Sequence, residues 1–324
     1  HKMLKYMNSI LHNFRPDLVV FSGWPHTPTC VALYYLCKHY FNIDVIFIDD
    51  MPLFDSRYHF VGNSVEELHL PFMNTYESND KVLMDPGVLK YLEDLRNVNG
   101  KVPGYIVEDY IDSKAVPLLL IKQLLALTVK VFLNRLSDHE KLIEWKKNRK
   151  RFDLKSSRLG SFEYLFFKLG LIIKNKLLYR SYKSLCSKVD LSQKYIYFAA
   201  SYQPEATTLH SSRSHEDVSL VLDMLSKYAP KGWVIYYKEH PYTFVHNSLS
   251  TLSKRNKAIY ENLAQYPNVK LISPYEKNFD LISQSQVVAS IAGTSTWEAA
   301  VRGIPSMCFG SVWYKGCKSI FSIN

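Results

Sequence analysis

Apolar runs that alternate with helix-like segments dominate the C-terminal part of the chain. Five short apolar runs are typical of buried strands: 195–201, 233–238, 269–273, 286–293 and 306–310. Four segments with the helical spacing of apolar residues separate these runs: 216–229, 250–266, 276–284 and 295–303. Strands that alternate with helices predict a mostly parallel sheet with helices on both faces. We therefore expect a doubly wound, Rossmann-like α/β domain over residues 191–324.

A shorter form of this pattern lies near the N-terminus. The runs 16–23 and 44–50 read as buried strands, and a helix-like segment lies between them. A strand, a helix and a strand within about 35 residues indicate a parallel βαβ unit. Residues 51–112 contain one helix-like segment, 88–97, among stretches rich in Pro, Asn and Asp. The sequence thus predicts an N-terminal Rossmann-like domain over residues 1–112.

Residues 113–190 are basic and read as a helical connector between the two domains. The apolar stretch 116–136 is interrupted by Lys122 and Lys130, so it predicts an amphipathic helix and not a membrane span. Two interpretations of the basic residues stay open. They form either the solvated faces of connecting helices or, over 141–183, an amphipathic surface that rests on anionic lipid.

Composition narrows the class of partner. The 324 residues carry a formal net charge of +10, which favours anionic partners, and an apolar share of 47% is that of a globular protein. No nucleic-acid-binding motif is present. The five cysteines are scattered and suggest a reducing cytoplasm. The chain has no signal-peptide layout, begins as though inside a helix and ends after a strand-like segment, so we expect an excerpt of a longer protein.

Polar residues follow four of the C-terminal strands. Ligands of open α/β sheets bind beyond the carboxyl ends of the strands, where these loops meet. The loops read SYQPEATT (201–208), KEHP (238–241), SPYE (273–276) and GTSTWE (293–298). Their convergence on one edge predicts a binding site there, with Ser273 as the contribution of the third loop.

The fourth loop has the composition of a phosphate-binding helix start. The first turn of a helix has unpaired N–H groups and a partial positive charge, and Gly293 permits close approach of the backbone to a ligand. Thr294, Ser295 and Thr296 add hydroxyl groups, and we expect Glu298 to reach a sugar hydroxyl such as a ribose diol. The alternative is that Ser295 and Glu298 form a capping box that needs no ligand.

The first two loops offer further candidates. Lys238 and His240 are expected to face an anionic ligand, or else to be a surface lysine and a helix-capping histidine. Glu239 alternates away from both and is expected to face solvent. Gln203 is a candidate hydrogen-bond donor and Glu205 a candidate base, unless their loop is only a turn.

The N-terminal strands end in residues that suit the opposite side of a cleft. His26 follows the first strand, and Asp49 and Asp50 end the second. Any of the three could act as the general base, and the sequence does not rank them. No dinucleotide fingerprint, P-loop, zinc-protease, nucleophile-elbow or EF-hand motif occurs. Nothing in the sequence requires a metal ion or another cofactor.

The segment 195–316 resembles the bacterial capsule polysaccharide biosynthesis family, glycosyltransferase-like proteins related to the capsule Kdo transferases. The resemblance is most specific in His240-Pro241 and in GTSTWEAAVRGIP (293–305). It implies a GT-B-like architecture, two Rossmann-like domains that face a cleft, with the nucleotide-sugar donor in the second domain and the acceptor approaching from the first. It also implies work on capsule or lipopolysaccharide glycans at the cytoplasmic face of the plasma membrane.

The resemblance also carries over to individual positions. Lys238 and His240 match the His-Pro loop, expected near the donor phosphate or sugar, and 294–298 matches the nucleotide-binding helix start. Gln203 matches a glutamine of related members, whereas Thr207 stands where they have an acidic residue. Because of that departure, a CMP-, UDP- or GDP-linked donor stays open.

The resulting prediction is a metal-independent glycosyltransferase that uses a nucleotide sugar as its substrate. Two alternatives are an isomerase of the nucleotide-sugar 2-epimerase type and a non-catalytic, membrane-associated component of polysaccharide assembly.

Overall fold

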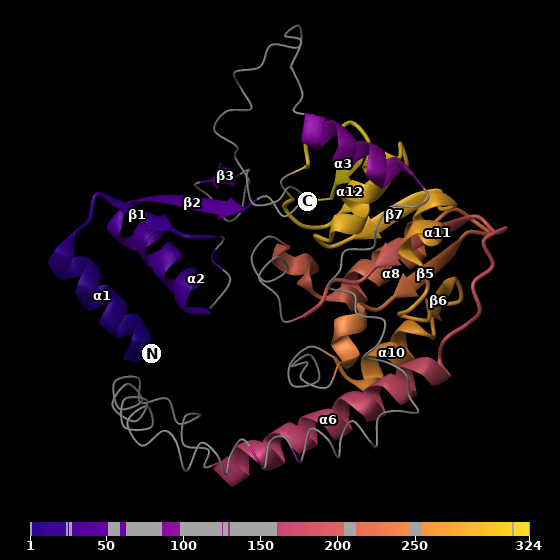
Figure 1. The fold of residues 1–324 in the computed structure, drawn as a ribbon, viewed down its shortest axis with the longest axis horizontal. Coiled ribbons are helices and arrows are strands. Elements are labelled where there is room, and N and C mark those ends of the chain that lie inside the picture. The colour runs from indigo at the N-terminus through magenta and orange to yellow at the C-terminus, as the bar shows by residue number, and fades with distance from the viewer. Residues whose placement is uncertain are drawn as a thin grey trace, which may run out of the picture.

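The computed structural model of the protein contains two α/β units, each built around its own sheet (Figure 1). It describes residues 2–23, 25, 28–50, 59–62, 86–97, 125, 129, 161–203, 212–245, 255–312 and 314–323. The helix expected over 116–136 lies outside this range except for Leu125 and Val129, as does the first half of the basic surface expected over 141–183. No helix of the described residues is long and apolar enough to cross a bilayer.

The N-terminal sheet contains three strands, β1 (Leu18–Phe21), β2 (Asp44–Asp50) and β3 (His59–Gly62). β1 and β2 are parallel, which confirms the βαβ unit, whereas the unpredicted β3 runs antiparallel to β2. Its helical segments are α1 (Lys2–Phe14), α2 (Pro28–Tyr35) and the π-helix η1 (Leu36–Phe41).

These helices cover one face of the N-terminal sheet, because Leu11 of α1 and Tyr34 of α2 share a core cluster with Phe47 of β2. On the other face, Leu18 and Val20 are exposed. The apolar run 16–23 predicted a buried strand, and this expectation is wrong for Leu18 and Val20.

The C-terminal sheet consists of six parallel strands in the order β6-β5-β4-β7-β8-β9. The strands are β4 (Tyr195–Ala199), β5 (Val234–Lys238), β6 (Val269–Ile272), β7 (Val287–Ser290), β8 (Ser306–Cys308) and β9 (Ile320–Ser322). Numbered from β4, this is the 3-2-1-4-5-6 order of the Rossmann fold. The α/β class and the Rossmann-like C-terminal unit are therefore confirmed, with β9 as a sixth strand beyond the five predicted.

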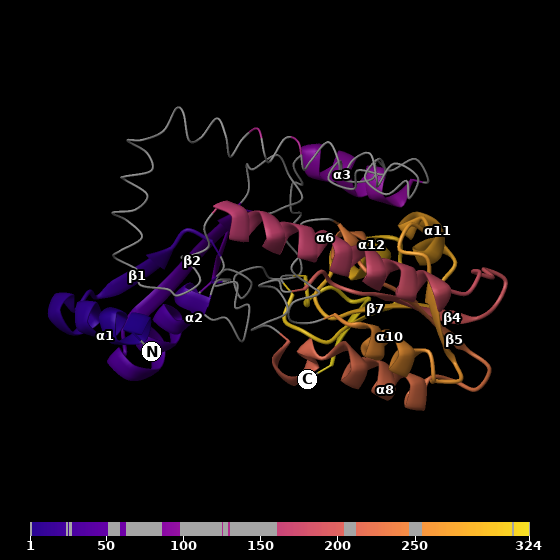
Figure 2. The same cartoon turned by 90° about the horizontal axis from the view of Figure 1, so that it is seen from below.

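Helices cover both faces of this sheet. One face packs against α6 (Ser161–Ser184), α8 (Val218–Tyr228) and α10 (Lys257–Leu263) through a single core cluster. The opposite face packs against α11 (Asn278–Ser283) and α12 (Thr294–Val301). Figure 2 shows α8 and α10 on one side of the strands and α11 and α12 on the other.

Two helices outside the predicted C-terminal domain also pack on this unit. Leu178 and Tyr182 of α6, which the sequence assigns to the connector, enter the core beneath β4 and β5. Arg96 of α3 (Pro86–Arg96), assigned to the N-terminal domain, donates a hydrogen bond from Nε to the carbonyl oxygen of Val301 in α12 (3.2 Å).

Candidate functional site

The carboxyl edge of the C-terminal sheet has a topological switch point between β4 and β7. The chain leaves β4 toward α8 on one face and leaves β7 toward α12 on the other. The two strands are neighbours, with Phe198 opposite Ala289, and β5 lies on the other side of β4. Open α/β sheets bind ligands at this point. The structure thus brings the loops that begin at residues 200, 239 and 291 to one edge, as the sequence predicts.

Helix α12 begins at Thr294, with Gly293 as its N-cap residue, and no side chain of the described residues caps it. Ser295 therefore lies inside the first turn, and the capping box expected from Ser295 and Glu298 as the alternative to a ligand site is absent. Gly293 donates a hydrogen bond from its amide to Oγ of Ser290 (2.8 Å). A Cβ atom at Gly293 would lie 2.6 Å from that oxygen, so only glycine fits.

The hydroxyl groups of the first turn point in different directions. Thr296 is fully buried, and its Oγ1 donates to the carbonyl oxygen of Gly293 (2.9 Å) and lies 2.8 Å from the hydroxyl of Tyr314. The expectation that Thr296 offers its hydroxyl to a ligand is therefore wrong. Thr294 is exposed and Ser295 is half-buried.

Ser201, two residues beyond the end of β4, has an unusual environment that the sequence analysis did not single out. Its residue surface is only 8% exposed, yet Oγ has no hydrogen-bond partner among the described residues. This oxygen lies 3.9 Å from the position that a Cβ would take at Gly293. Buried hydroxyl groups are almost always hydrogen-bonded, because an unsatisfied one costs free energy. Ser201 is therefore a candidate ligand contact.

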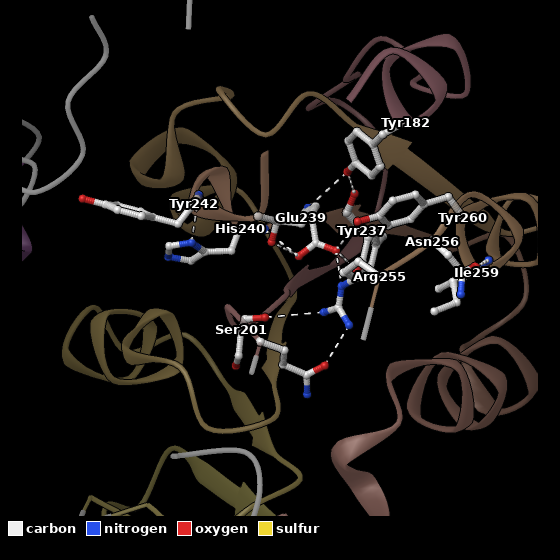
Figure 3. Close-up of polar contacts among 12 residues, drawn as sticks. Tyr182, Ser201, Tyr237, Glu239, His240, Tyr242, Arg255, Asn256, Ile259 and Tyr260 are labelled. Atoms are coloured by element: carbon white, nitrogen blue, oxygen red, sulfur yellow. Dashed lines mark hydrogen bonds and ion pairs between the residues drawn. The ribbon is translucent and has the colours of Figure 1, made fainter. Parts of the chain in front are cut away.

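His240 caps the short 3-10 helix η6 (Pro241–Phe244), as one of the two interpretations of the sequence predicts. Its Nδ1 accepts a hydrogen bond from the amide of Tyr242 (3.2 Å). The neutral ring must then carry its proton on Nε2. Burial lowers the pKa of His240, although the charge of Glu239 opposes this effect. The ring is thus a neutral hydrogen-bond donor at pH 7. It lies beside the aromatic ring of Tyr242 (Figure 3) and also contacts that of Tyr202.

Lys238 points to the face of the sheet that α11 and α12 cover. Its Nζ donates to the carbonyl oxygen of Glu276 (2.6 Å) and to Oδ1 of Asn278, so it braces the loop between β6 and α11. Burial lowers the pKa of Lys238 to about 8, against the charges of Glu276 and Glu298. The side chain of Lys238 thus forms its hydrogen bonds within the protein, while its positive charge lowers the pKa of the neighbouring Glu298.

Glu298 is the fifth of the eight residues of α12 and is partly buried. Burial raises the pKa of Glu298, and the positive charges of Arg302 and Lys238 oppose that rise. The nearest carboxylate oxygen of Glu298 is 3.7 Å from Nη1 of Arg302, one turn further along the helix. The distance is too long for a tight hydrogen bond, so this carboxylate keeps acceptor capacity for a sugar hydroxyl.

Gln203 and Ser273, two expected ligand contacts, form hydrogen bonds within the protein. The buried amide of Gln203 donates from Nε2 to the carbonyl oxygen of Glu216 (3.0 Å) and accepts from Nη1 of Arg255 at Oε1 (2.8 Å). Oγ of Ser273 accepts from the amide of Tyr275 (3.3 Å). Both side chains thus help to fix the loops that carry them, and their contact with a donor substrate stays a prediction.

Glu239 does not face solvent. It is fully buried and forms an ion pair with Nε of Arg255 (2.7 Å). Alternation along β5 points Glu239 away from Lys238, as expected, but helices cover both faces of this sheet. Arg255, which lies just before α10, is a residue that the sequence analysis missed, because it reaches the edge only through the fold.

The remaining candidates stay predictions. His26, Glu205 and Thr207 lie outside the described residues. Asp50 pairs with His59 in the ladder between β2 and β3, and the side chains of Asp49 and Asp50 are not described. Among the described residues, no group of His, Cys, Asp and Glu could hold a metal ion.

No protein-family model matches the sequence, and no curated protein does. Two solved structures of KpsC from Thermosulfurimonas dismutans have partial similarity. One, a β-Kdo 2,7 transferase, has 16% identity over 48% of this chain and 46% of that chain, with a TM-score of 0.31. The other, a β-Kdo 2,4 transferase, has 11% identity over 95% of this chain and 73% of that chain, with a TM-score of 0.36.

The UDP-GlcNAc 2-epimerase of Methanocaldococcus jannaschii has 13% identity over the whole of this chain and 70% of that chain, with a TM-score of 0.31. At such identities and TM-scores, these likenesses carry no functional argument. The α/β class rests on the strand order of the chain itself.

Proposed function

We propose that the protein is a glycosyltransferase that moves a sugar from a nucleotide-sugar donor to a capsule or lipopolysaccharide glycan. One observation carries this proposal. At the switch point, the N-terminus of α12, which no described side chain caps, lies beside the buried hydroxyl of Ser201, which has no described partner. Helix amides and a nearby hydroxyl are the donors that a phosphate group needs, and the helix dipole adds positive potential.

The residues around this point suit the parts of such a donor. The amides of Thr294 and Ser295 and the hydroxyl of Ser201 bind a phosphate, and Glu298 accepts from ribose hydroxyls. His240 donates from Nε2 to an oxygen of the leaving phosphate. These donors stabilise the negative charge that develops as the bond between sugar and phosphate breaks. The charge of Lys238 adds to this effect below about pH 8.

The acceptor approaches from the N-terminal unit in this proposal. A general base must remove its proton, and His26, Asp49, Asp50 and Glu205 are the candidates. His240 is a poor candidate, because Nδ1 is already hydrogen-bonded to the amide of Tyr242 and the proton on Nε2 makes that atom a donor.

Nucleotide binding tests the proposal directly. Thermal-shift measurements with CMP, UDP, GDP and CDP should identify one base that stabilises the protein, and calorimetry should then give its affinity. We expect His240→Ala and Glu298→Ala to weaken that affinity or the turnover. The matched control is Glu261→Ala, which changes an exposed glutamate of α10. Wild-type affinity and turnover in both site variants, or no response to any nucleotide, would refute the proposal.

The same assay separates a transferase from an isomerase. A 2-epimerase converts its nucleotide sugar without an acceptor, whereas a transferase needs the acceptor glycan to consume the donor at its full rate. Incubation of the identified nucleotide sugar with and without acceptor, followed by chromatography, distinguishes the two.

We further propose that the protein works at the cytoplasmic face of the plasma membrane, with α6 against anionic lipid. In the described part of this helix, Ile173 and Leu177 are 55% and 57% exposed and lie one turn apart. The exposed Arg180 lies on the same face, because it follows Leu177 by three residues. Exposed apolar residues beside a cation are typical of a helix that lies in a membrane interface.

A further inference from the structure

We propose that Glu239 and Arg255 form a buried positioning pair that fixes the two loops of the nucleotide site, those after β4 and β5. This inference rests on the proposed function, because it assigns a role within that site. Neither residue is placed to touch the nucleotide. Both act through neighbours that are, namely Ser201 and His240.

The carboxylate of Glu239 is the centre of a fully buried network (Figure 3). Oε2 accepts hydrogen bonds from Nε of Arg255 (2.7 Å) and from the hydroxyls of Tyr237 (2.7 Å) and Tyr260 (2.8 Å). Oε1 accepts from the backbone amide of His240 (2.9 Å). The pair therefore fixes the backbone at His240, the residue to which the proposed function assigns the hydrogen bond to the leaving phosphate.

The guanidinium of Arg255 extends the network to the loop after β4. Nη1 donates to Oε1 of Gln203 (2.8 Å), and Nη2 lies 3.5 Å from the carbonyl oxygen of Ser201. Arg255 is only 3% exposed. A single side chain thus links the loop that supplies His240 to the loop that supplies the Ser201 hydroxyl.

Helix α6 supports the pair from the other side. The hydroxyl of Tyr182 accepts a hydrogen bond from the amide of Glu239 (3.1 Å) and donates to the carbonyl oxygen of Ile272 at the end of β6 (2.8 Å). Figure 3 shows Tyr182 above the carboxylate and Arg255 below it. The position of Glu239 is therefore set by β5, β6 and α6 together.

A role in geometry explains this arrangement better than a role in stability. A buried ion pair contributes little net stability, because the loss of hydration offsets the attraction of the charges. Burial alone would raise the pKa of Glu239, but the charge of Arg255 and the hydrogen bonds hold it below its ordinary value. The carboxylate stays ionised and keeps all its donors, so the pair is rigid at neutral pH.

The test uses two variants of the full chain. Glu239→Leu/Arg255→Met removes both charges at once, so no buried charge is left unpaired. It also leaves the hydroxyls of Tyr237 and Tyr260 without their acceptor, so we expect it to fold with a lower melting temperature than the wild type. Arg255→Lys keeps the charge but loses the forked contact to Gln203 and Ser201. The control is Lys257→Met/Glu261→Gln, which removes the exposed ion pair of α10.

The first readout is affinity for the nucleotide that the wild type binds, measured by calorimetry beside the melting temperature. We expect a loss of tenfold or more in both variants, a melting temperature of Arg255→Lys near that of the wild type, and no change in the control. Wild-type affinity in a folded Arg255→Lys protein and in the folded double variant would overturn the proposal.

The second readout needs no nucleotide, so it separates this proposal from the proposed function. ¹⁵N NMR of the histidine rings should report a single neutral tautomer for His240 in the wild type, with the proton on Nε2. In the double variant the backbone at His240 loses its acceptor, so we expect a shifted or mixed tautomer signal. A wild-type His240 signal in the folded double variant would overturn the positioning role. A wild type that binds no nucleotide would refute only the proposed function.

Discussion

Oγ of Ser201 lies 3.9 Å from the position that a Cβ would take at Gly293. Ser201 follows β4 and Gly293 follows the neighbouring strand β7, so the hydroxyl of one loop lies close to the backbone of the other. After β4 the chain continues to α8 on one face of the sheet, and after β7 it continues to α12 on the other face. No helix therefore lies over the space between these two loops. The proposed phosphate site depends on this pair. Each of the two residues therefore supports a separate prediction.

We predict that Ser201→Ala weakens nucleotide binding without lowering stability. A hydrogen bond to a charged group contributes about 1.5–3 kcal/mol, so affinity should fall about tenfold or more. The free energy of unfolding should stay the same or rise by up to about 1 kcal/mol, because a buried hydroxyl without a described partner is removed. Urea unfolding and calorimetry measure the two effects.

Ser285→Ala is the matched control for this change. Ser285 is as buried as Ser201, but its Oγ donates to the carbonyl oxygen of Ile282 (2.8 Å). Its loss should cost about 1 kcal/mol of stability and leave affinity unchanged. The same outcome in Ser201→Ala, lower stability with full affinity, would show that the Ser201 hydroxyl is structural.

We predict that Gly293→Ala distorts the start of α12. The new Cβ would lie 2.6 Å from Oγ of Ser290, which is fully buried and cannot move away freely. Overpacking of this kind costs about 1–3 kcal/mol, and the displaced helix start should also bind nucleotide more weakly. As a control, Gly170→Ala in α6 has open space at its Cβ and should stabilise the protein by about 0.5–1 kcal/mol. Unchanged stability and affinity in Gly293→Ala would contradict the close packing of residue 293 against Oγ of Ser290.

The strands of the C-terminal unit could be predicted because their burial on both faces leaves uninterrupted apolar runs. Strands β4 to β8 begin at residues 195, 234, 269, 287 and 306, each within one residue of its predicted start. β3 and β9 were missed, although β6 and β8 are equally short. Phe321 of β9 is largely exposed, so the strand lacks the buried run by which the others were found.

The backbone of the candidate site was easier to predict than its side chains. The position of α12 at the sheet edge follows from local sequence, and the structure agrees. The inward direction of Thr296 depends on Tyr314, and the burial of Glu239 depends on Arg255. Those partners lie 18 and 16 residues away, and no local pattern specifies which loop brings them to the site. Ser201 escaped notice because an unpaired hydroxyl is a property of packing, not of sequence.

Nucleotide affinity should fall as the pH rises above about 8. Burial lowers the pKa of Lys238 to about 8, so in the free protein its charge is present below that pH and lost above it. An anionic ligand favours the charged form, and binding above pH 8 must therefore take up a proton. Affinity should then fall by up to about tenfold per pH unit, while the phosphate itself is already ionised.

Calorimetry between pH 7 and 9.5, in buffers of different ionisation enthalpy, measures both the affinity and the proton uptake. Lys238→Met should bind weakly at every pH and take up no proton. Lys257→Met, which changes an exposed lysine of α10, should keep the wild-type profile. If Lys238→Met retains the same pH dependence, another group is responsible and Lys238 has no electrostatic role in binding.

Membrane binding through α6 should depend on its two exposed apolar side chains and on salt. Ile173→Ser/Leu177→Ser removes the apolar contact. Each buried aliphatic side chain contributes about 1.5–3 kcal/mol, so the affinity for vesicles that contain anionic lipid, measured by co-sedimentation, should fall about a hundredfold or more. Attraction of cations such as Arg180 to the lipid is screened by salt, so wild-type binding should also weaken as ionic strength rises.

Leu89→Ser is the matched control, because Leu89 is similarly exposed but lies on α3. That helix packs against α12, which covers the opposite face of the sheet from α6. Equal losses in Leu89→Ser and in the α6 variant would mean that the vesicles bind exposed apolar residues without preference. The helix would then have no specific role at the membrane.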